Sequence, residues 1–204
     1  MIAELRETQH RKFYLKVASV LERLKVSPNT WTLVGFTFGA GMALFIYLKM
    51  YLIALIFGLL MALCDIMDGE IAKKNNTTTP FGKLLDVTTD KYVEGMIGLA
   101  SGLSMPQVLL PSLVWGVLSV WGSIVISLVS NVGSSLTTRK VFKLVGRGDR
   151  GLIIAAGLIL GGLVSPVFFT YSMILITVSS HITALSMLIQ YYFILRKDDG
   201  SPRS

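Results

Sequence analysis

The sequence predicts an all-α integral membrane protein with six transmembrane helices and an N-terminal amphipathic helix at the membrane interface. Hydrophobic residues make up 52% of the 204 residues and charged residues only 15%, which is little charge for a soluble domain. The apolar residues also gather in uncharged runs at 31–48, 50–64, 95–138 and 151–180. One spanning helix needs about 20 apolar residues, so the two longest runs each hold more than one span.

Breaks between the apolar runs set the expected spans. Lys49 separates the first span from the second, the segment around Pro106 separates the third from the fourth, and Pro166 separates the fifth from the sixth. The predicted spans cover residues 31–49, 51–72, 82–103, 107–136, 151–164 and 167–195. We expect one domain over 1–204, made of an interfacial helix over 1–27, a six-helix bundle over 28–195 and a polar tail over 196–204.

The expected N-terminal helix is amphipathic. Its apolar residues recur at helical spacing, and its cationic residues occupy the other positions; the apolar set is Phe13, Val17, Val20, Leu21 and Leu24. Such a helix lies in the membrane interface, although a soluble helix packed on neighbouring loops would show the same pattern. Ser27 and Pro28 then read as an N-cap and a first-turn proline for the first span.

The Lys and Arg residues predict the orientation in the membrane. If both termini lie on one side, that side carries 18 of the 19 cationic residues, and the other side carries only Lys49. Cytoplasmic loops are enriched in Lys and Arg, so we expect both termini and the segments 73–91 and 139–150 in the cytoplasm. The polar N-terminus shows no secretory signal, and the single cysteine, Cys64, cannot form an internal disulfide. A basic surface that faces anionic lipid explains the net charge of +7. The sequence shows no nucleic-acid-binding motif, so we expect no nucleic-acid partner.

Four aspartates stand at the ends of two apolar segments. Asp65 and Asp68 are three residues apart near the end of the second predicted span, and Asp86 and Asp90 are four residues apart near the start of the third. Residues at these spacings share a helix face. The link between the two spans is short, so the helices should be antiparallel neighbours. The two carboxylate pairs are therefore expected to face each other across one helix interface.

Carboxylates in this position need a counter-charge. Each aspartate at the centre of a spanning helix costs about 2.5–3.5 kcal/mol on insertion scales, and four together repel one another. Oxygen ligands without His or Cys suit Mg²⁺, Mn²⁺ or Ca²⁺ rather than Zn²⁺. Gly69, Ala72 and Gly82 leave room for a ligand beside them. We expect a polar cavity that holds one or two divalent ions; for Asp65 or Asp90 alone, an ordinary charge at a helix end is the alternative.

The spacing of these residues resembles the signature of the CDP-alcohol phosphotransferase family, D-x2-D-G-x2-A-R-x8-G-x3-D-x3-D. From Asp65 to Asp90 this chain reads D-x2-D-G-x2-A-K-x8-G-x3-D-x3-D, so seven of the eight fixed positions match and every spacing is kept. The departure is Lys73, which keeps the charge of the usual Arg but not its planar fork. Asn29 and Thr32 match a P-N-x-x-T element seen at the first span in this family.

The resemblance implies a reaction in which a CDP-lipid donates its phosphoryl group to an acceptor hydroxyl and CMP leaves. It implies Mg²⁺ or Mn²⁺, two ions in all, bound by Asp65, Asp68, Asp86 and Asp90, with Asp90 also the general base. It implies CDP-lipid binding by Asn29, Thr32, Asp68, Gly69, Ala72, Lys73 and Gly82. It further implies a homodimer in the bilayer with a cytoplasmic active site.

A basic cluster lies between the fourth and fifth predicted spans. Arg139, Lys140 and Arg150 stand near the expected cytoplasmic ends of their helices. Arg196, at the end of the sixth span, is expected on the same side and could reach this cluster. Such a cluster suits an acceptor that carries phosphate, and within the family it is similar to that of synthases that use inositol phosphate. Glycerol 3-phosphate and serine are the alternative acceptors. For the cluster itself, the alternative is an orientation signal that binds anionic headgroups.

Other features leave two readings each. Three pairs of glycines four residues apart predict close helix packing or a dimer face: Gly35 with Gly39, Gly98 with Gly102, and Gly157 with Gly161. His181 is expected to form a packing hydrogen bond, and Glu94 to orient a neighbour or pair with Lys91. An ion-coupled transporter is the rival class. It predicts charges at the bilayer midplane and internal repeats, and neither pattern is evident here.

Overall fold

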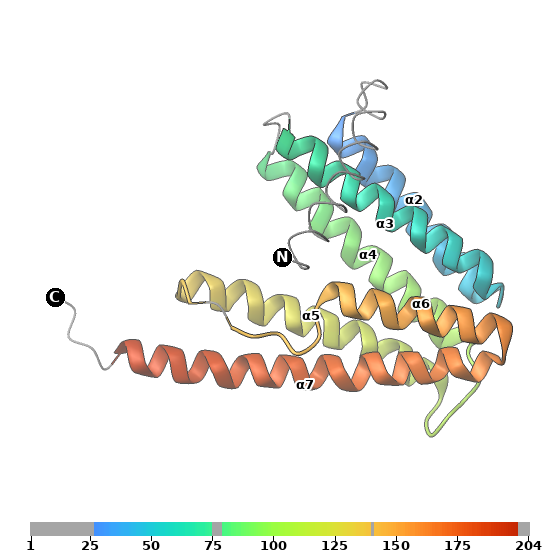
Figure 1. Cartoon of the computed structure of the whole chain (residues 1–204). Helices are drawn as coiled ribbons and strands as arrows, with labels where there is room; N and C mark the ends of the chain where they lie inside the picture. Colours follow the sequence, from blue (N-terminus) through green and yellow to red (C-terminus); the bar gives the residue numbers. More distant parts are fainter. Residues whose placement is uncertain (1–26, 75–78, 140, 200–204) are drawn as a thin grey trace, which may run out of the picture. The chain divides into compact units, whose positions relative to one another are not determined.

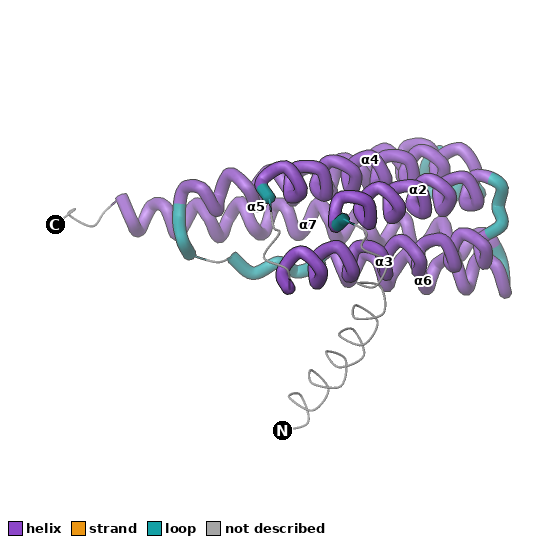
Figure 2. Tube along the Cα trace, turned by 90° about the horizontal axis from the view of Figure 1, so that it is seen from above, coloured by secondary structure: helices purple, strands orange, loops and turns teal. Residues whose placement is uncertain are grey.

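The computed structural model describes residues 27–74, 79–139 and 141–199, which form helices and no β-sheet (Figure 2). The six helices are α2 (Pro28–Tyr47), α3 (Tyr51–Lys74), α4 (Pro80–Ser104), α5 (Ser112–Leu136), α6 (Arg147–Leu163) and α7 (Pro166–Asp199). Each predicted span therefore corresponds to one helix. The expected interfacial helix falls almost wholly on residues 1–26, which lie outside the described residues.

Three helices begin with the same local chemistry, a hydroxyl residue followed by proline. Ser27, Thr79 and Ser165 precede the prolines that open α2, α4 and α7. The Oγ of Ser27 accepts a hydrogen bond from the N–H of Thr30 at 3.3 Å, and Oγ1 of Thr79 accepts one from the N–H of Gly82 at 2.9 Å. A capping oxygen and a proline in the first turn both favour helix initiation, and the predicted cap at Ser27 is confirmed.

The turn between α2 and α3 closes on Lys49, as the sequence predicts. Lys49 has a φ of 60°, in the left-handed region. Its N–H bonds to the carbonyl of Ile46 at 2.9 Å, and the N–H of Met50 bonds to the carbonyl of Phe45 at 2.8 Å. These two bonds form the Schellman arrangement that satisfies the last carbonyls of a helix. A single cationic residue thus ends one helix and lets the next begin two residues later.

Two predicted starts were wrong. The fourth span was expected from residue 107, but α5 begins at Ser112, because Leu109 has a φ of 62° and Pro111 disfavours helical geometry in the residue before it. The fifth was expected from residue 151, but α6 begins at Arg147. There the carboxylate of Asp149 accepts the N–H of Gly146 at 2.8 Å and caps the helix four residues earlier. Arg150 therefore lies inside the first turn of α6 rather than opening it.

The chain divides into two compact units. The first contains α2 up to Met42, α3 from Ile56 and α4 up to Val93. In this unit the three helices lie side by side (Figure 1), and glycines of α2 let its neighbours approach. A Cβ atom at Gly35 would lie 3.2 Å from Cβ of Cys64, and one at Gly39 would lie 2.6 Å from a methyl group of Val93.

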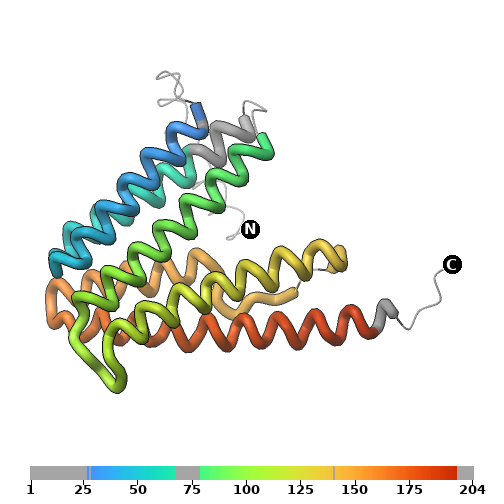
Figure 3. The backbone as a smooth tube through the Cα atoms, turned by 180° about the vertical axis from the view of Figure 1, so that it is seen from behind, coloured from blue at the N-terminus to red at the C-terminus, as the bar shows by residue number. Residues whose placement is uncertain are grey.

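The second unit contains Ala43–Leu55 and the chain from Glu94 onward. Here α7 packs against both α5 and α6 (Figure 3). A Cβ atom at Gly157 would meet the side chain of Ser172, and one at Gly161 would lie 3.1 Å from Cβ of Phe169. All three predicted glycine pairs therefore mark close helix packing within the chain.

The interior of the second unit mixes apolar side chains such as Leu158 and Phe169 with hydroxyl groups, and its surface is apolar. Its buried side chains include many hydroxyls: Ser101, Ser104, Ser112, Ser119, Ser123, Thr170, Ser172, Thr177, Ser180 and Thr183. Many of these bond to carbonyls of other segments, as Thr177 does to Trp115 at 3.3 Å. The ring of His181 lies 3.2 Å from the carbonyl of Leu118, which confirms its packing role. Exposed residues on the same helices are large and apolar, such as Trp121 at 62%. Buried hydroxyls that bond to helix carbonyls, together with large apolar residues outside, are typical of helices packed in a bilayer.

Among the described residues, three helices are long and apolar enough to cross a membrane: Asn29–Tyr47, Ser112–Leu136 and Pro166–Arg196. A shorter apolar helix covers Tyr51–Met67. The remaining two helices depart from a simple span for separate reasons. Charged residues occupy the first half of α4, and α6 has only 17 residues, which is about 25 Å of helix. These features are those of a multi-pass membrane protein.

The contact between α4 and α5 gives a test of the packing. A Cβ atom at Gly116 would meet the carbonyl oxygen of Gly98 and lie 3.0 Å from Cα of Gly102. We expect Gly116→Ala to destabilise the protein by about 1–3 kcal/mol, because the backbones would have to separate. Gly95→Ala is the matched control, because a Cβ there meets no described atom within 4 Å. Thermal unfolding in detergent measures both; equal midpoints for the two variants would contradict the packing.

Candidate functional site

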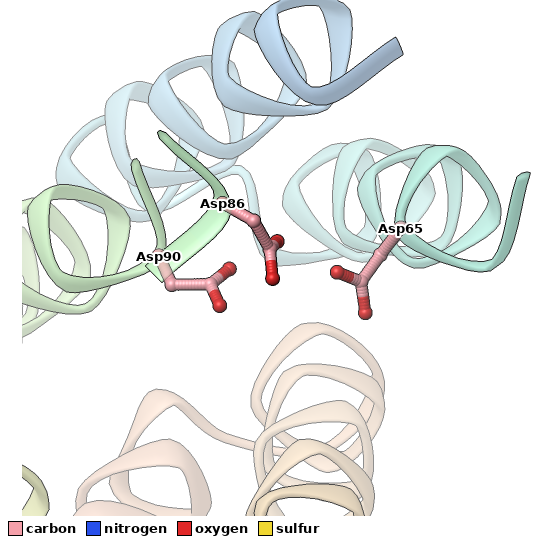
Figure 4. A group of neighbouring side chains, drawn as sticks. All are labelled: Asp65, Asp86 and Asp90. Atoms are coloured by element: carbon pink, nitrogen blue, oxygen red, sulfur yellow. The ribbon is translucent and has the colours of Figure 1, made fainter. Parts of the chain in front are cut away.

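Three of the four predicted aspartates come together in the first unit. Asp65 projects from α3, and Asp86 and Asp90 project from successive turns of α4, so that their carboxylates converge (Figure 4). One oxygen from each lies within 4.8 Å of the others. Asp65 is exposed, and Asp86 and Asp90 are partly buried. The predicted meeting of carboxylates from two antiparallel helices is confirmed for these three residues; the side chain of Asp68 lies outside the described part.

The three carboxylates fit a hard divalent cation. Two oxygens on opposite sides of one Mg²⁺ ion lie about 4.2 Å apart, twice the Mg–O distance, and Ca²⁺ allows somewhat more. The three oxygens all lie within 4.8 Å of one another, so small side-chain movements would bring them into this range. No His or Cys joins the cluster among the described residues, and an all-oxygen donor set favours Mg²⁺, Mn²⁺ or Ca²⁺ over Zn²⁺. Carboxylates this close repel one another, and a bound cation would reduce that repulsion.

The start of α2 lies beside the start of α4, and both carry residues that the sequence assigned to nucleotide binding. A Cβ atom at Gly82 would lie 3.1 Å from Oδ1 of Asn29 and 3.1 Å from Oγ1 of Thr79. The structure thus brings together Asn29 and Gly82, two residues that the sequence assigned to CDP-lipid binding. Thr32 follows one turn later in α2 and is half-buried. For Gly69, Ala72 and Lys73 the structure describes the helical backbone of α3 but not the side chains.

The basic linker is residues 137–146, between α5 and α6 (Figure 1). Polar side chains of α7 bond to the backbone of its described part. Gln190 accepts the N–H of Phe142 at 2.9 Å and donates to its carbonyl at 3.0 Å. Oγ1 of Thr183 accepts the N–H of Val145 at 3.2 Å. The sequence analysis did not predict these hydrogen bonds between α7 and the linker. The available signal was Gln190 itself, the one side-chain amide in the sixth predicted span.

The predicted acceptor residues differ in their surroundings. Arg139 and Arg196 are exposed, whereas Arg150 is mostly buried. Nη2 of Arg150 lies 3.7 Å from Oε1 of Glu94, so Glu94 faces a cationic residue of α6. Lys140 lies outside the described residues. In the part of the second unit that the structure describes, Arg139 therefore lies at the surface and Arg150 faces a carboxylate.

A family model described as CDP-alcohol phosphatidyltransferase matches residues 25–195, which is most of the chain. The match includes the carboxylate cluster, the residues at the start of α2 and the basic linker. It begins just before α2 and ends within α7. The six helices described above therefore lie almost entirely inside the matched region.

Curated relatives show partial similarity. The chain is 39% identical over 82 residues to an uncharacterized protein of Aquifex aeolicus and 28% identical over 127 residues to the archaetidylinositol phosphate synthase of Methanothermobacter thermautotrophicus. These matches span 40% and 61% of this chain and 41% and 62% of the relatives, less than two thirds of either. The chain is also 29% identical over 181 residues to the phosphatidylinositol phosphate synthase of Corynebacterium glutamicum, covering 85% of this chain and 81% of that protein.

Solved structures share the fold. The phosphatidylinositol phosphate synthase of Mycobacterium tuberculosis with CDP-DAG bound superimposes with a TM-score of 0.77 at 21% identity, covering 89% of this chain and 94% of that one. The same protein in complex with manganese and citrate gives a TM-score of 0.77 at 22% identity, covering 88% of each chain. At this identity the likeness establishes the helical fold, and it does not identify the ligands of this chain.

Proposed function

The chain belongs to the CDP-alcohol phosphatidyltransferase family, and we propose that it transfers the phospholipid moiety of a CDP-lipid to a phosphorylated polar acceptor. The donor is CDP-archaeol or CDP-diacylglycerol, and CMP is released. The observation that carries this proposal is the convergence of Asp65, Asp86 and Asp90, whose carboxylate oxygens lie within 4.8 Å of one another. These three residues occupy aspartate positions of the family signature at its spacing.

The aspartate cluster binds the divalent cations in this proposal. Asp65, Asp86 and Asp90 are ligands, Asp68 is the fourth, and two ions of Mg²⁺ or Mn²⁺ are held. When bound, the cations supply the positive charge that neutralises the diphosphate of the donor and the leaving CMP. The fit of the carboxylates to an oxygen-liganded cation supports this assignment. So does the solved relative that contains manganese.

The nucleotide of the donor binds between the starts of α2 and α4. Asn29 and Thr32 contact the CDP group, and Gly82 gives it room. The proximity of Asn29 Oδ1 to the position of a Cβ at Gly82 supports placing these residues together. Asp68, Gly69, Ala72 and Lys73 complete the site in α3, with Lys73 supplying a charge to the diphosphate. The solved relative with CDP-DAG bound supports a CDP-lipid donor.

Asp90 acts as the general base. Its carboxylate takes the proton of the acceptor hydroxyl as that oxygen forms a bond to the lipid-bearing phosphorus. The bond between this phosphorus and the bridging oxygen breaks, and CMP leaves with the electron pair. Phosphoryl transfer depends mostly on positioning and charge stabilisation, so one base is enough protein chemistry. The position of Asp90 at the edge of the carboxylate cluster, partly buried, supports this role.

The acceptor carries a phosphate, and inositol phosphate is the acceptor that we propose. Arg139, Lys140, Arg150 and Arg196 bind that phosphate. Support comes from the charge of the basic linker and from curated relatives named archaetidylinositol phosphate synthase and phosphatidylinositol phosphate synthase. Glycerol 3-phosphate is the alternative with the same charge. Serine is the alternative acceptor without a phosphate. In that case the four cationic residues would bind only anionic lipid headgroups.

An acceptor panel separates these possibilities. The purified protein is given CDP-diacylglycerol, Mn²⁺ and one acceptor at a time: inositol phosphate, free inositol, glycerol 3-phosphate or serine. We expect turnover with inositol phosphate to exceed turnover with free inositol by about a hundredfold, since a charge-assisted phosphate contact is worth roughly 1.5–3 kcal/mol. A rate with free inositol or serine equal to the rate with inositol phosphate would contradict a phosphorylated acceptor. A higher rate with glycerol 3-phosphate would identify that compound, rather than inositol phosphate, as the acceptor.

The membrane arrangement is also part of the proposal. All six helices cross or enter the bilayer as one domain, with residues 1–27 in the interface and both termini and the active site on the cytoplasmic side of the cell membrane. The chain acts as a homodimer. The apolar exterior of the second unit and the grouping of 18 of the 19 cationic residues in the two terminal segments and in 73–91 and 139–150 support the membrane crossing and its orientation. A transporter with the same helices would release no CMP.

A further inference from the structure

A buried ion pair lies beside the basic linker in the second unit. The side chains of Arg150 and Glu94 are only 11% and 27% exposed, and Nη2 of the first lies 3.7 Å from Oε1 of the second. A guanidinium that leaves water to this extent is unfavourable unless an opposite charge faces it. Glu94 supplies that charge from α4. It therefore restricts where the guanidinium of Arg150 can lie.

Ser123 holds Glu94 in turn. Its Oγ donates to Oε2 of Glu94 at 2.6 Å, a short distance typical of a hydroxyl bonded to an ionised carboxylate. Ser123 is 3% exposed and belongs to α5. One carboxylate oxygen thus faces α5 and the other faces α6. The row from Ser123 through Glu94 to Arg150 links three helices by side chains alone.

Arg150 retains donors beyond this pair. A guanidinium has five N–H donors in a planar fork, and the ion pair engages Nη2. The Nε atom is buried and has no hydrogen-bond acceptor among the residues that the structure describes. A buried donor without an acceptor is unfavourable. An anion that accepts from Nε and a neighbouring N–H removes that penalty, and phosphate matches such a pair of donors.

We propose that Glu94 and Ser123 are positioning residues that orient Arg150 toward the phosphate of the acceptor. The inference rests on the proposed function, in which Arg150 binds that phosphate. Glu94 is itself an anion and repels phosphate, so its contribution acts through Arg150. A guanidinium already held in one orientation loses less side-chain freedom when the acceptor binds. The quantity that depends on this row of residues is the KM for the phosphorylated acceptor.

The test uses full-length purified protein and four single variants. Glu94→Gln removes the charge that faces Arg150, Ser123→Ala removes the bond to Glu94, and Arg150→Lys removes the fork. We expect Glu94→Gln and Ser123→Ala to raise the KM for the phosphorylated acceptor about tenfold, and Arg150→Lys at least as much, because all three weaken the charge-assisted contact with the phosphate. The KM for the CDP-lipid and the kcat at saturating acceptor should stay near the wild-type values. Ser127→Ala is the matched control, because Ser127 bonds to the carbonyl of Ser123 within its own helix at 3.0 Å.

Two further measurements separate positioning from stability. Ser123→Thr keeps a hydroxyl and should restore the KM toward the wild-type value. Glu94→Gln in the Arg150→Lys background should raise the KM little beyond Arg150→Lys alone, because both act on one contact. An unchanged acceptor KM in Glu94→Gln and Ser123→Ala, whatever their melting temperatures, would overturn the positioning role. Equal effects of Glu94→Gln on the donor and acceptor KM would also overturn it.

The wild-type protein distinguishes the two possible failures. If wild type prefers a phosphorylated acceptor and the variants keep its KM, the positioning inference alone is wrong. If wild type shows no preference for phosphorylated over unphosphorylated acceptors, the proposed acceptor class is wrong and the inference is wrong with it. Both results come from the same set of acceptor titrations.

Discussion

Replacing Asp90 with asparagine is expected to abolish turnover while CDP-lipid binding persists. Asparagine keeps the size of the side chain and an oxygen that can face the cation, which is supplied at saturating concentration, but it cannot accept the acceptor's proton. The loss should be about 10²–10⁴-fold in kcat, the usual contribution of a general base. Steady-state release of CMP measures the rate, and equilibrium binding of CDP-diacylglycerol measures the retained affinity. A rate within a few-fold of wild type would remove Asp90 from the role of base.

A control from the same helix makes this result specific. Thr88 lies two residues before Asp90, is exposed, and donates its hydroxyl to the carbonyl of Leu84 in its own helix at 2.7 Å. Thr88→Val is close in size and removes only that bond. It should leave both the rate and the binding unchanged. A comparable loss of rate in Thr88→Val would mean that any substitution in this part of α4 disturbs the helix. The loss in Asp90→Asn could then not be assigned to a missing base.

Removing the divalent cation is expected to stop the reaction. The carboxylates of Asp65, Asp86 and Asp90 gather within 4.8 Å, and without a cation they repel the diphosphate that they are proposed to hold. Treatment with a chelator should reduce CMP release to background, and Mg²⁺ or Mn²⁺ should restore it. Zn²⁺ should restore less, because the described cluster offers oxygen ligands only. Full activity in excess chelator would contradict a metal-dependent mechanism.

The metal site can also be measured without turnover. We expect Asp86→Asn to weaken Mn²⁺ binding roughly a hundredfold, about 2.7 kcal/mol, because one of three converging charges is lost. Electron paramagnetic resonance of free Mn²⁺ during a titration reports this affinity directly. Asp149→Asn is the control, since Asp149 accepts the N–H of Gly146 at the start of α6 and the amide oxygen of asparagine can accept the same hydrogen bond. Equal weakening in both variants would contradict a site at the cluster.

The aspartate cluster was predictable because its determinants are local. Asp86 and Asp90 are one helical turn apart, and Asp65 meets them because a short link joins two antiparallel helices. The same holds for the helix starts at Ser27–Pro28 and for the break at Lys49, where short-range hydrogen bonds decide the geometry. The glycine pairs also predicted close packing correctly. A glycine lets another helix approach because it has no side chain, and this holds whichever helix the neighbour is.

The partners of buried polar residues were not predictable in this way. Glu94 and Arg150 are 56 residues apart and Phe142 and Gln190 are 48 apart, so no local pattern links them. The start of α5 was misplaced because apolar residues around Leu109 look helical in composition, whereas its positive φ and Pro111 form a turn. Lys73 departs from the family signature, and its effect on the diphosphate contact stays a prediction.

The central claim is that this chain joins a CDP-lipid to a phosphorylated acceptor. It is tested most directly by measuring CMP and the mass of the lipid product in one reaction containing purified protein, CDP-diacylglycerol, inositol phosphate and Mn²⁺. We predict one CMP released for each new lipid, whose mass includes the phosphorylated headgroup, and neither product without acceptor or cation. Release of CMP without a new lipid, or no release under any of these conditions, would contradict the account.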